Sequence, residues 1–178
     1  EPKRNNIKDS NMFSLYETAF KKKLSNADEF NYDLLHKWSL DNVEEFWSLV
    51  WDDSNIIGTK GANIINNYND LIKSTFFPEG YLNFSENLLA GKDTREAIVF
   101  YGESKERQSL SLKELREKVI TLAKWLTKNG VEQGDRVAVL ATNSPETIIS
   151  MLATAALGAI FTSCSPDFGE EGIIDRFG

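Results

Sequence analysis

Few side chains in this sequence could act as nucleophiles, acid–base groups or metal ligands, and they lie far apart. The 178 residues include one cysteine, Cys164, and one histidine, His36. A chain with one of each can form neither an intrachain disulfide nor a zinc site of the Cys/His type. A catalytic Cys–His pair would have to join distant segments, and a lone cysteine is more often a small buried apolar group. We interpret both residues as structural and expect no metal site.

Motifs that bind phosphate or activate a serine are missing from the sequence. It contains no G-x-G-x-x-G, no G-x-x-x-x-G-K-[ST] and no G-x-S-x-G. The string Gly58-Thr59-Lys60-Gly61 is too short for a phosphate loop, and the carboxylate pairs Asp52-Asp53 and Glu170-Glu171 are typical of helix surfaces. What remains is a candidate ligand-facing loop, Ser163–Phe168, which by itself indicates no reaction.

The charge balance argues against a nucleic-acid partner. The formal net charge is −7 and the pI is about 4.9, and an acidic surface repels a phosphate backbone. The densest basic run is Lys21-Lys22-Lys23. We place it in the last turn of a predicted helix, where it would complement the helix dipole.

One uncharged segment has about the length of a membrane span but not the composition of one. Thr147 to Pro166 contains no charge, yet Ser150, Thr154 and Gly158 interrupt it, and no aromatic or basic belt flanks it. A buried helix followed by a buried strand explains it better, so we expect no membrane span. The missing signal-peptide pattern and the missing disulfide framework favour a cytoplasmic location.

The first part of the chain is predicted to be helical. We expect a disordered or expression-derived leader over residues 1–10 and a helical segment over 11–89. Its first helix is predicted to be capped by Asn11 and to run through Lys23. Asp41-Asn42-Val43-Glu44 has capping-box spacing. The helix after it carries an apolar face, and two interpretations of that face stay open: packing against a neighbouring helix, or an aromatic stacking platform. Its members are Val43, Phe46, Trp47, Val50 and Trp51.

In residues 90–178, predicted strands and helices alternate as in an α/β domain. Strands are predicted at 97–101, 108–110, 136–140 and 159–163, and the strand at 108–110 is expected to return beside the one at 97–101. Helices are predicted after Ser111, where 111–114 has capping-box spacing, after Ser144-Pro145 as N-cap and first helical residue, and from Asp167. Asn129-Gly130 is expected to stop the first of these helices. The run at 136–140 does not alternate, which is typical of a strand buried on both faces. The alternation of elements predicts an α/β fold: the start of a doubly wound, largely parallel sheet with helices on its faces, here incomplete. Ligands bind such sheets beyond the carboxyl ends of the strands, which points to the loops after Leu140 and Ser163.

Several strings resemble the acyl-adenylate-forming enzymes, which include acyl-CoA synthetases, luciferases and peptide-synthetase adenylation domains. The strings that carry this resemblance are 110–115 (LSLKEL), 130–137 (GVEQGDRV) and 151–169 (MLATAALGAIFTSCSPDFG). Three further strings distinguish branches within this family, and they resemble the acetoacetate–CoA ligase branch. They are SCSPDFG at 163–169, FPEGYLNFSENLL at 77–89 and EEFWSLVW at 44–51. The resemblance covers nearly all of the chain after Phe13.

The resemblance implies a two-step reaction in the full-length protein. A carboxylate reacts with ATP to give an acyl-adenylate and pyrophosphate, and CoA then displaces AMP, with Mg²⁺ assisting. In the family, the phosphate loop, the ribose-binding aspartate and the catalytic lysine lie further along the chain than Gly178. The resemblance therefore implies no catalytic residue among these 178 residues. It also implies a chain that is inactive alone and that binds ATP, Mg²⁺ and CoA at most weakly.

The family also implies one candidate binding loop. In related acetyl-CoA synthetases the corresponding loop lies along the CoA entry path, and the matching positions are Ser165, Pro166, Asp167 and Phe168. Only Phe168 matches, since the acetyl enzymes have an aromatic-Gly-Gly string where this chain has Ser-Pro-Asp. That departure argues against the acetate branch. The alternative is that Asp167 caps a helix and Pro166 stiffens its entry.

Two other functions stay open: an acetyl- or propionyl-CoA synthetase segment, or a non-catalytic binding module of the same fold. The expected partners are small molecules, namely acetoacetate, ATP and CoA. An unfinished sheet also exposes an unpaired edge, so we expect non-native self-association.

Overall fold

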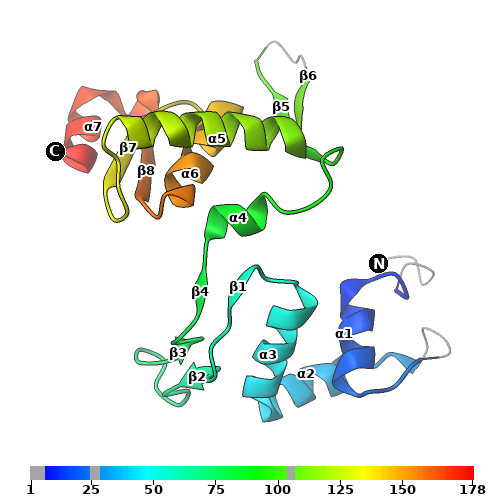
Figure 1. The fold of residues 1–178 in the computed structure, drawn as a ribbon. Helices are drawn as coiled ribbons and strands as arrows, with labels where there is room; N and C mark the ends of the chain where they lie inside the picture. Colours follow the sequence, from blue (N-terminus) through cyan, green and yellow to red (C-terminus); the bar gives the residue numbers. More distant parts are fainter. Residues whose placement is uncertain (1–6, 25–28, 104–106) are drawn as a thin grey trace. The chain divides into compact units, whose positions relative to one another are not determined.

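The computed structural model describes residues 7–24, 29–103 and 107–178, and it divides into an N-terminal unit, Glu1–Leu82, and a C-terminal unit, Asn83–Gly178 (Figure 1). The first six residues of the expected leader lie outside the described part. Residues 7–10 form a turn in which the Ser10 hydroxyl donates to the Ile7 carbonyl at 2.7 Å. The predicted boundary between residues 89 and 90 stays a prediction, and helix α4 (Phe84–Leu88) belongs to the C-terminal unit.

Three helices open the N-terminal unit: α1 (Asn11–Ala19), α2 (Tyr32–Asp41) and α3 (Val43–Asp53). Two details of the predicted first helix are wrong. Ser10, not Asn11, is the N-cap, because its side chain accepts from the Phe13 N–H at 3.2 Å. The helix also ends at Ala19, and Lys21 has a φ of 50°, so the lysine run follows the helix instead of completing its last turn. Lys23 pairs with Glu17 at 2.8 Å.

Aromatic packing holds these helices together. Trp38 of α2 meets Phe46 of α3 edge-on at 6.4 Å between ring centroids, and buried Trp51 packs on Phe77 at 4.8 Å. The tryptophan-bearing face of α3 is therefore a packing surface and not a stacking platform. The predicted capping box at 41–44 is wrong: Asp41 ends α2, and Asn42 precedes α3 without a side-chain cap.

Two small antiparallel pairs follow α3, inside the segment 11–89 that the sequence predicted to be helical. β1 (Gly58–Thr59) pairs with β4 (Tyr81–Leu82), and β2 (Ile65–Asn66) pairs with β3 (Thr75–Phe76). Each strand has two residues, too few for a period-two pattern to be visible in the sequence. Lys60 ties the first pair to α3, since its ammonium lies 2.7 Å from an Asp52 carboxylate oxygen and 2.9 Å from the Ser48 hydroxyl.

The C-terminal unit contains the α/β elements. After α4 come β5 (Glu96–Tyr101), β6 (Arg107–Ser111), α5 (Leu112–Lys128), β7 (Arg136–Leu140), α6 (Pro145–Ala156), β8 (Ile160–Cys164), the 3₁₀ turn η3 (Pro166–Phe168) and α7 (Gly169–Phe177).

A parallel strand pair confirms the α/β fold class. β7 and β8 run parallel, joined by α6, with Leu140 opposite Cys164. β5 and β6 form an antiparallel pair, which confirms the prediction of a strand that returns beside its neighbour, and this pair is separate from β7 and β8. β7 alternates between half-buried Val137 and Val139 and exposed neighbours, which corrects the prediction of burial on both faces. The sheet is incomplete, as expected.

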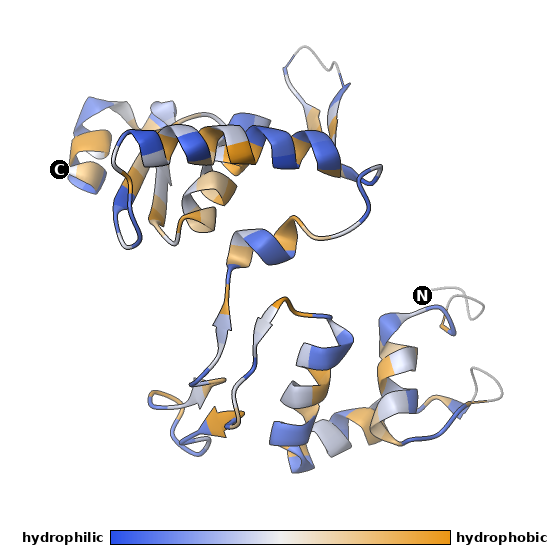
Figure 2. Ribbon diagram, viewed as in Figure 1, coloured by the Kyte–Doolittle hydropathy of each residue, from blue (hydrophilic) through white to orange (hydrophobic). Residues whose placement is uncertain are grey.

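The core of this unit lies between α5 and α6. Figure 2 shows hydrophobic and hydrophilic residues alternating along α5 beside a largely hydrophobic α6. Asn83, the N-cap of α4, donates to the Ala155 carbonyl at 3.0 Å and so ties α4 to the end of α6. The buried core side chains are Leu115, Val119, Leu126, Ile149, Leu152 and Ala153.

A capping box begins α5, as the sequence predicts. The Ser111 hydroxyl accepts from the Glu114 N–H at 3.3 Å, and the Glu114 carboxylate accepts from the Ser111 N–H at 2.8 Å. The hydrogen bond from the Ser111 side chain, followed by that from its backbone, lowers the pKa of Glu114 below its usual value. Gly130, with a φ of 86°, supplies the predicted stop after the helix.

Replacing Ser111 by alanine tests the importance of this cap. Ser111→Ala should destabilise the C-terminal unit by about 1 kcal/mol, because an N-terminal N–H of α5 loses its acceptor. Urea unfolding followed by circular dichroism measures the change. Lys113→Ala, on an exposed position of the same turn, is the matched control and should stay within about 0.5 kcal/mol of the wild type. Equal stability of both variants would show that the cap contributes nothing.

Candidate functional site

The two loops indicated by the sequence leave the same edge of the parallel pair. Leu140 and Cys164 are register partners at the carboxyl ends of β7 and β8, and the Ala141 N–H donates to the Cys164 carbonyl at 3.1 Å. Residues 141–144 and 165–168 therefore start side by side. This is the edge at which α/β sheets bind ligands.

Ser165 organises the second loop. Its hydroxyl donates to a carboxylate oxygen of Asp167 at 2.9 Å and accepts from the Asp167 N–H at 3.4 Å, while its carbonyl accepts from the Phe168 N–H at 3.2 Å. Pro166 is the first residue of the 3₁₀ turn. Ser165 is thus the cap, which corrects the alternative that Asp167 caps a helix.

The aromatic ring at the end of the loop is exposed and has a cation beside it. Phe168 is 58% exposed, and the guanidinium carbon of Arg176 lies 5.6 Å from its ring centroid. Arg176 also donates to the Ser163 carbonyl at 3.5 Å, so it links α7 to the end of β8. Sequence reasoning missed Arg176, because the change from a 3₁₀ turn to an α-helix between the two residues conceals their shared face.

Gly169 makes the turn from the loop into α7. It has a φ of 68° and a ψ of 174°, a region of backbone conformation that is essentially restricted to glycine. Glu170 and Glu171 follow in the first helical turn, where they complement the helix dipole. These two carboxylates lie next in sequence to a loop that also has the Arg176 guanidinium beside it.

The first loop is held by short polar contacts. The Thr147 hydroxyl donates to the Thr142 carbonyl at 2.6 Å. Ser144 precedes α6 and Pro145 is its first residue, as predicted, but the Ser144 side chain does not cap the helix. Ser144 instead hydrogen-bonds the carboxylate of Glu146, which, with the backbone N–H of Glu146, lowers the pKa of that carboxyl.

The structure places the two reactive side chains away from any catalytic arrangement. Cys164 is 4% exposed at the end of β8, and His36 is an exposed residue of α2 that stacks on Tyr32 with 6.0 Å between ring centroids. Within the described ranges, no three His, Cys, Asp or Glu side chains gather in a group that could hold a metal ion. The loop can position a ligand through a hydroxyl, a proline and an aromatic ring.

The apolar segment that resembled a membrane span is divided between two elements. It forms the 12-residue α6 and the strand β8. In the part of the chain that the structure describes, no helix has the length and apolar character needed to cross a bilayer.

Comparison with known proteins decides the family. The family model of the AMP-binding enzymes matches residues 86–177. This range includes the strands β7 and β8 and the loops 141–144 and 165–168 that follow them. The chain belongs to the AMP-binding enzyme family. The expected resemblance to the acyl-adenylate-forming enzymes is thereby confirmed.

Named relatives narrow the likeness within this family. The acetoacetyl-coenzyme A synthetase of Rhizobium meliloti (strain 1021) is 45% identical over 148 residues, which is 83% of this chain and 23% of that protein. The acetoacetyl-CoA synthetase of Macaca fascicularis is 37% identical over 151 residues, with 83% and 22% coverage. The malonamoyl-CoA synthetase vrtB of Penicillium aethiopicum is 31% identical over 159 residues, with 82% and 21% coverage.

A solved member of the family has the same fold over almost the whole chain. The acetoacetyl-CoA synthetase from Streptomyces lividans matches with a TM-score of 0.86 and 30% sequence identity, covering 99% of this chain and 28% of that one. The chain thus spans about a quarter of the length of the relatives that it matches.

Replacing Gly169 tests whether the loop depends on its backbone conformation. Gly169→Ala should destabilise the loop and α7 by about 1–3 kcal/mol, because alanine adopts this conformation only with strain. Hydrogen exchange of the amides of residues 166–173 should become faster. Asp175→Ala, an exposed change in the same helix, should leave the exchange rates unchanged. Unchanged exchange in Gly169→Ala would contradict the assignment.

Proposed function

We propose that this chain is the N-terminal part of an AMP-forming acetoacetate–CoA ligase. The observation that carries the proposal is the 45% identity to the acetoacetyl-coenzyme A synthetase of Rhizobium meliloti over 148 residues. The TM-score of 0.86 to the Streptomyces lividans enzyme supports it independently. We place the protein in the cytoplasm, where its substrates would be acetoacetate, ATP and CoA.

The proposed reaction has two balanced steps. An acetoacetate oxygen attacks the α-phosphorus of ATP, forming the acyl-adenylate as the bond to pyrophosphate breaks. The CoA thiolate then attacks the acyl carbon, and AMP leaves with the electron pair of the broken C–O bond. The first step needs neutralisation of phosphate charge. We assign no residue of this chain to Mg²⁺ or to the phosphates of ATP, and we propose that the 178 residues alone are inactive.

The part that we assign to this chain is a segment of the CoA path, at Ser165, Pro166, Asp167 and Phe168. The exposed Phe168 ring and the remaining acceptor site of the Ser165 hydroxyl offer contacts to an uncharged, flexible group. The loop therefore suits the pantetheine arm of CoA better than its nucleotide end.

The acyl group is the open part of the proposal. The acetoacetyl and malonamoyl groups named for the relatives differ only by a methyl or an amino group at their far end. Both carry a second carbonyl two bonds from the activated one. This shared chemistry favours a short carboxylate with a β-carbonyl over acetate or propionate.

A substrate panel tests the proposed activity. The full-length protein that contains this chain should form the CoA ester of acetoacetate, with AMP and pyrophosphate as co-products. The rate with acetoacetate should exceed the rates with acetate and propionate at least tenfold. Acetate and propionate lack the β-carbonyl, so the groups of the enzyme that hydrogen-bond this carbonyl would be left unpaired. Mass spectrometry of the CoA esters measures this, with malonamate as a further substrate. The isolated 178 residues should give no product.

Three results would each refute part of this proposal. Equal or faster turnover of acetate or propionate would favour the acetyl- or propionyl-CoA synthetase alternative. No turnover of any carboxylate by the full-length protein would favour the non-catalytic binding module. Product formed by residues 1–178 alone would disprove the predicted inactivity.

Loop variants of the full-length protein test the CoA path. Phe168→Ala should raise the KM for CoA about tenfold, because an apolar contact to the thiol arm is lost. The pyrophosphate exchange of the first half-reaction should not change, since CoA takes no part in it. Asp175→Asn, an exposed change in the neighbouring helix, is the control and should change KM less than twofold. Equal loss in both half-reactions would mean that the substitution acts through folding and not through CoA.

A further inference from the structure

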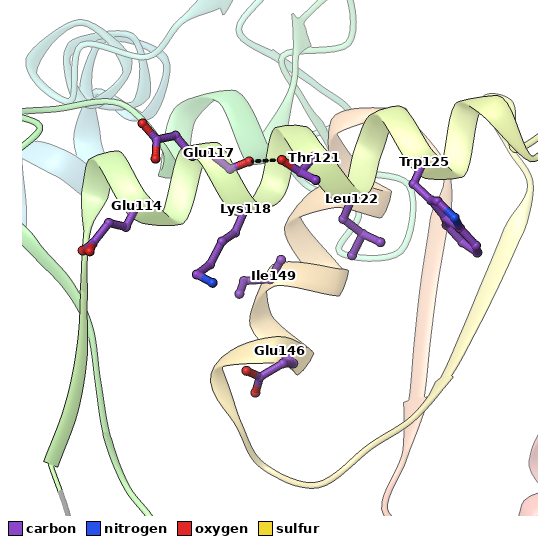
Figure 3. A pocket seen from close by; sticks show the side chains of 8 residues that line it. All are labelled: Glu114, Glu117, Lys118, Thr121, Leu122, Trp125, Glu146 and Ile149. Atoms are coloured by element: carbon purple, nitrogen blue, oxygen red, sulfur yellow. Dashed lines mark hydrogen bonds between the residues drawn. The ribbon is translucent and has the colours of Figure 1, made fainter.

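A second feature of the C-terminal unit lies apart from the loop at 165–168: an open groove between α5 and α6. Its volume is about 740 Å³, and Figure 3 shows the side chains that line it. They are Glu114, Glu117, Lys118, Thr121, Leu122, Trp125, Glu146 and Ile149. A smaller hollow that shares Lys118, Glu146 and Ile149 extends it toward the β5–β6 hairpin. The proposed ligase activity uses none of these side chains.

The lining side chains of α5 form one stripe with unequal ends. Glu114, Lys118, Leu122 and Trp125 are spaced by four, four and three residues, which places them on one helical face. The carboxylates of Glu114 and Glu117 lie at the N-terminal end of the stripe, and Leu122 and Trp125 lie at the other (Figure 3). From α6, Glu146 adds a third carboxylate, and buried Ile149 adds apolar surface.

The acidic end has an excess of negative charge. Lys118 is the one cation of the lining, and it interacts electrostatically with both Glu114 and Glu146. Two carboxylates thus lie near one ammonium, and the Glu117 side chain points away from Lys118 (Figure 3). In the described part of the chain, no ion pair involves Glu117, which is exposed. This end of the groove complements a positively charged partner.

The apolar end exposes an unusually large side chain. Trp125 is 58% exposed although the same helix buries Leu115, Val119 and Leu126 on its core face. Tryptophan is enriched among the residues that carry most of the energy of an interface. The exposed indole of Trp125 lies next to the apolar side chains Leu122 and Ile149. We therefore expect a bound segment to cover this indole.

We propose that this groove binds an amphipathic helix of a partner protein, with lysine or arginine side chains at one end and aliphatic side chains at the other. The stripe from Glu114 to Trp125 is about 16 Å long at 1.5 Å per residue, the length of three helical turns. Laying an apolar helix face into a groove between helices is a common mode of recognition. The cations meet Glu114, Glu117 and Glu146, and the aliphatic side chains cover Trp125, Leu122 and Ile149.

Titration of the full-length protein that contains this chain with designed peptides tests the proposal. The probe is a fluorescein-labelled, 14-residue helical peptide with lysines in one half and leucines at i, i+3, i+4 and i+7 in the other. Its counterpart has glutamate in place of every lysine. Fluorescence anisotropy should show saturable binding of the lysine peptide at least tenfold tighter than that of the glutamate peptide. Binding should weaken between 50 and 500 mM NaCl, because the charge contacts are exposed.

Matched variants locate the binding on the protein. Trp125→Ala and Glu117→Lys should each weaken binding of the lysine peptide about tenfold. Ile120→Ala, on the same helix outside the groove, and Glu132→Lys, with the same charge change outside the groove, should stay within twofold. Circular dichroism of each variant should match the wild type, since all four side chains are largely exposed.

Three outcomes would overturn the proposal. Equal weakening by Glu117→Lys and Glu132→Lys would mean that the acidic surface attracts the peptide without a site. Equal affinity for both peptides would mean that charge plays no part. A Trp125-dependent dimer in analytical ultracentrifugation, with no peptide binding, would mean that a second copy of the chain covers the groove.

Discussion

The C-terminal unit depends on the burial of one stripe of α5 against α6. Leu115, Val119 and Leu126 meet Ile149, Leu152 and Ala153, and each buried leucine or valine contributes about 1.5–3 kcal/mol. The capping box fixes the residue at which α5 begins, and the packing of this stripe against α6 keeps it away from solvent. α6 in turn is the crossover between β7 and β8, so its packing places both strands. The site and the groove are thus two consequences of one helix pair.

The same arrangement explains why the candidate site and the groove have different chemistry. The loops at 141–144 and 165–168 follow the carboxyl ends of two parallel strands, where backbone groups and small polar side chains gather. The groove lies along the helices, where the side chains that do not face the core collect both charge and apolar surface. Position within an α/β layer, more than local sequence, decides which kind of ligand each can accept.

Much of the C-terminal unit could be predicted because its signals are local and repeated. Strand β7, the capping box at Ser111 and the helix beginning at Pro145 each follow from residues within a few positions of one another. The lysine run at 21–23 was misplaced, because no local feature indicates that α1 ends at Ala19. The two-residue strands of the N-terminal unit are set by their partners across the chain, which a single sequence does not reveal. Arg176 was missed for a similar reason, since a change of helix type decides what it reaches.

The parallel pair is assembled from one continuous stretch of chain. Arg136 is the register partner of Ile160 and Leu140 that of Cys164, so every paired residue lies 24 positions from its partner. Closing so short a segment costs little chain entropy compared with pairing across a whole domain. During synthesis, this strand–helix–strand module can therefore form soon after Cys164 leaves the ribosome. The edge that carries both loops would then exist as a template while later residues are still being added to the chain.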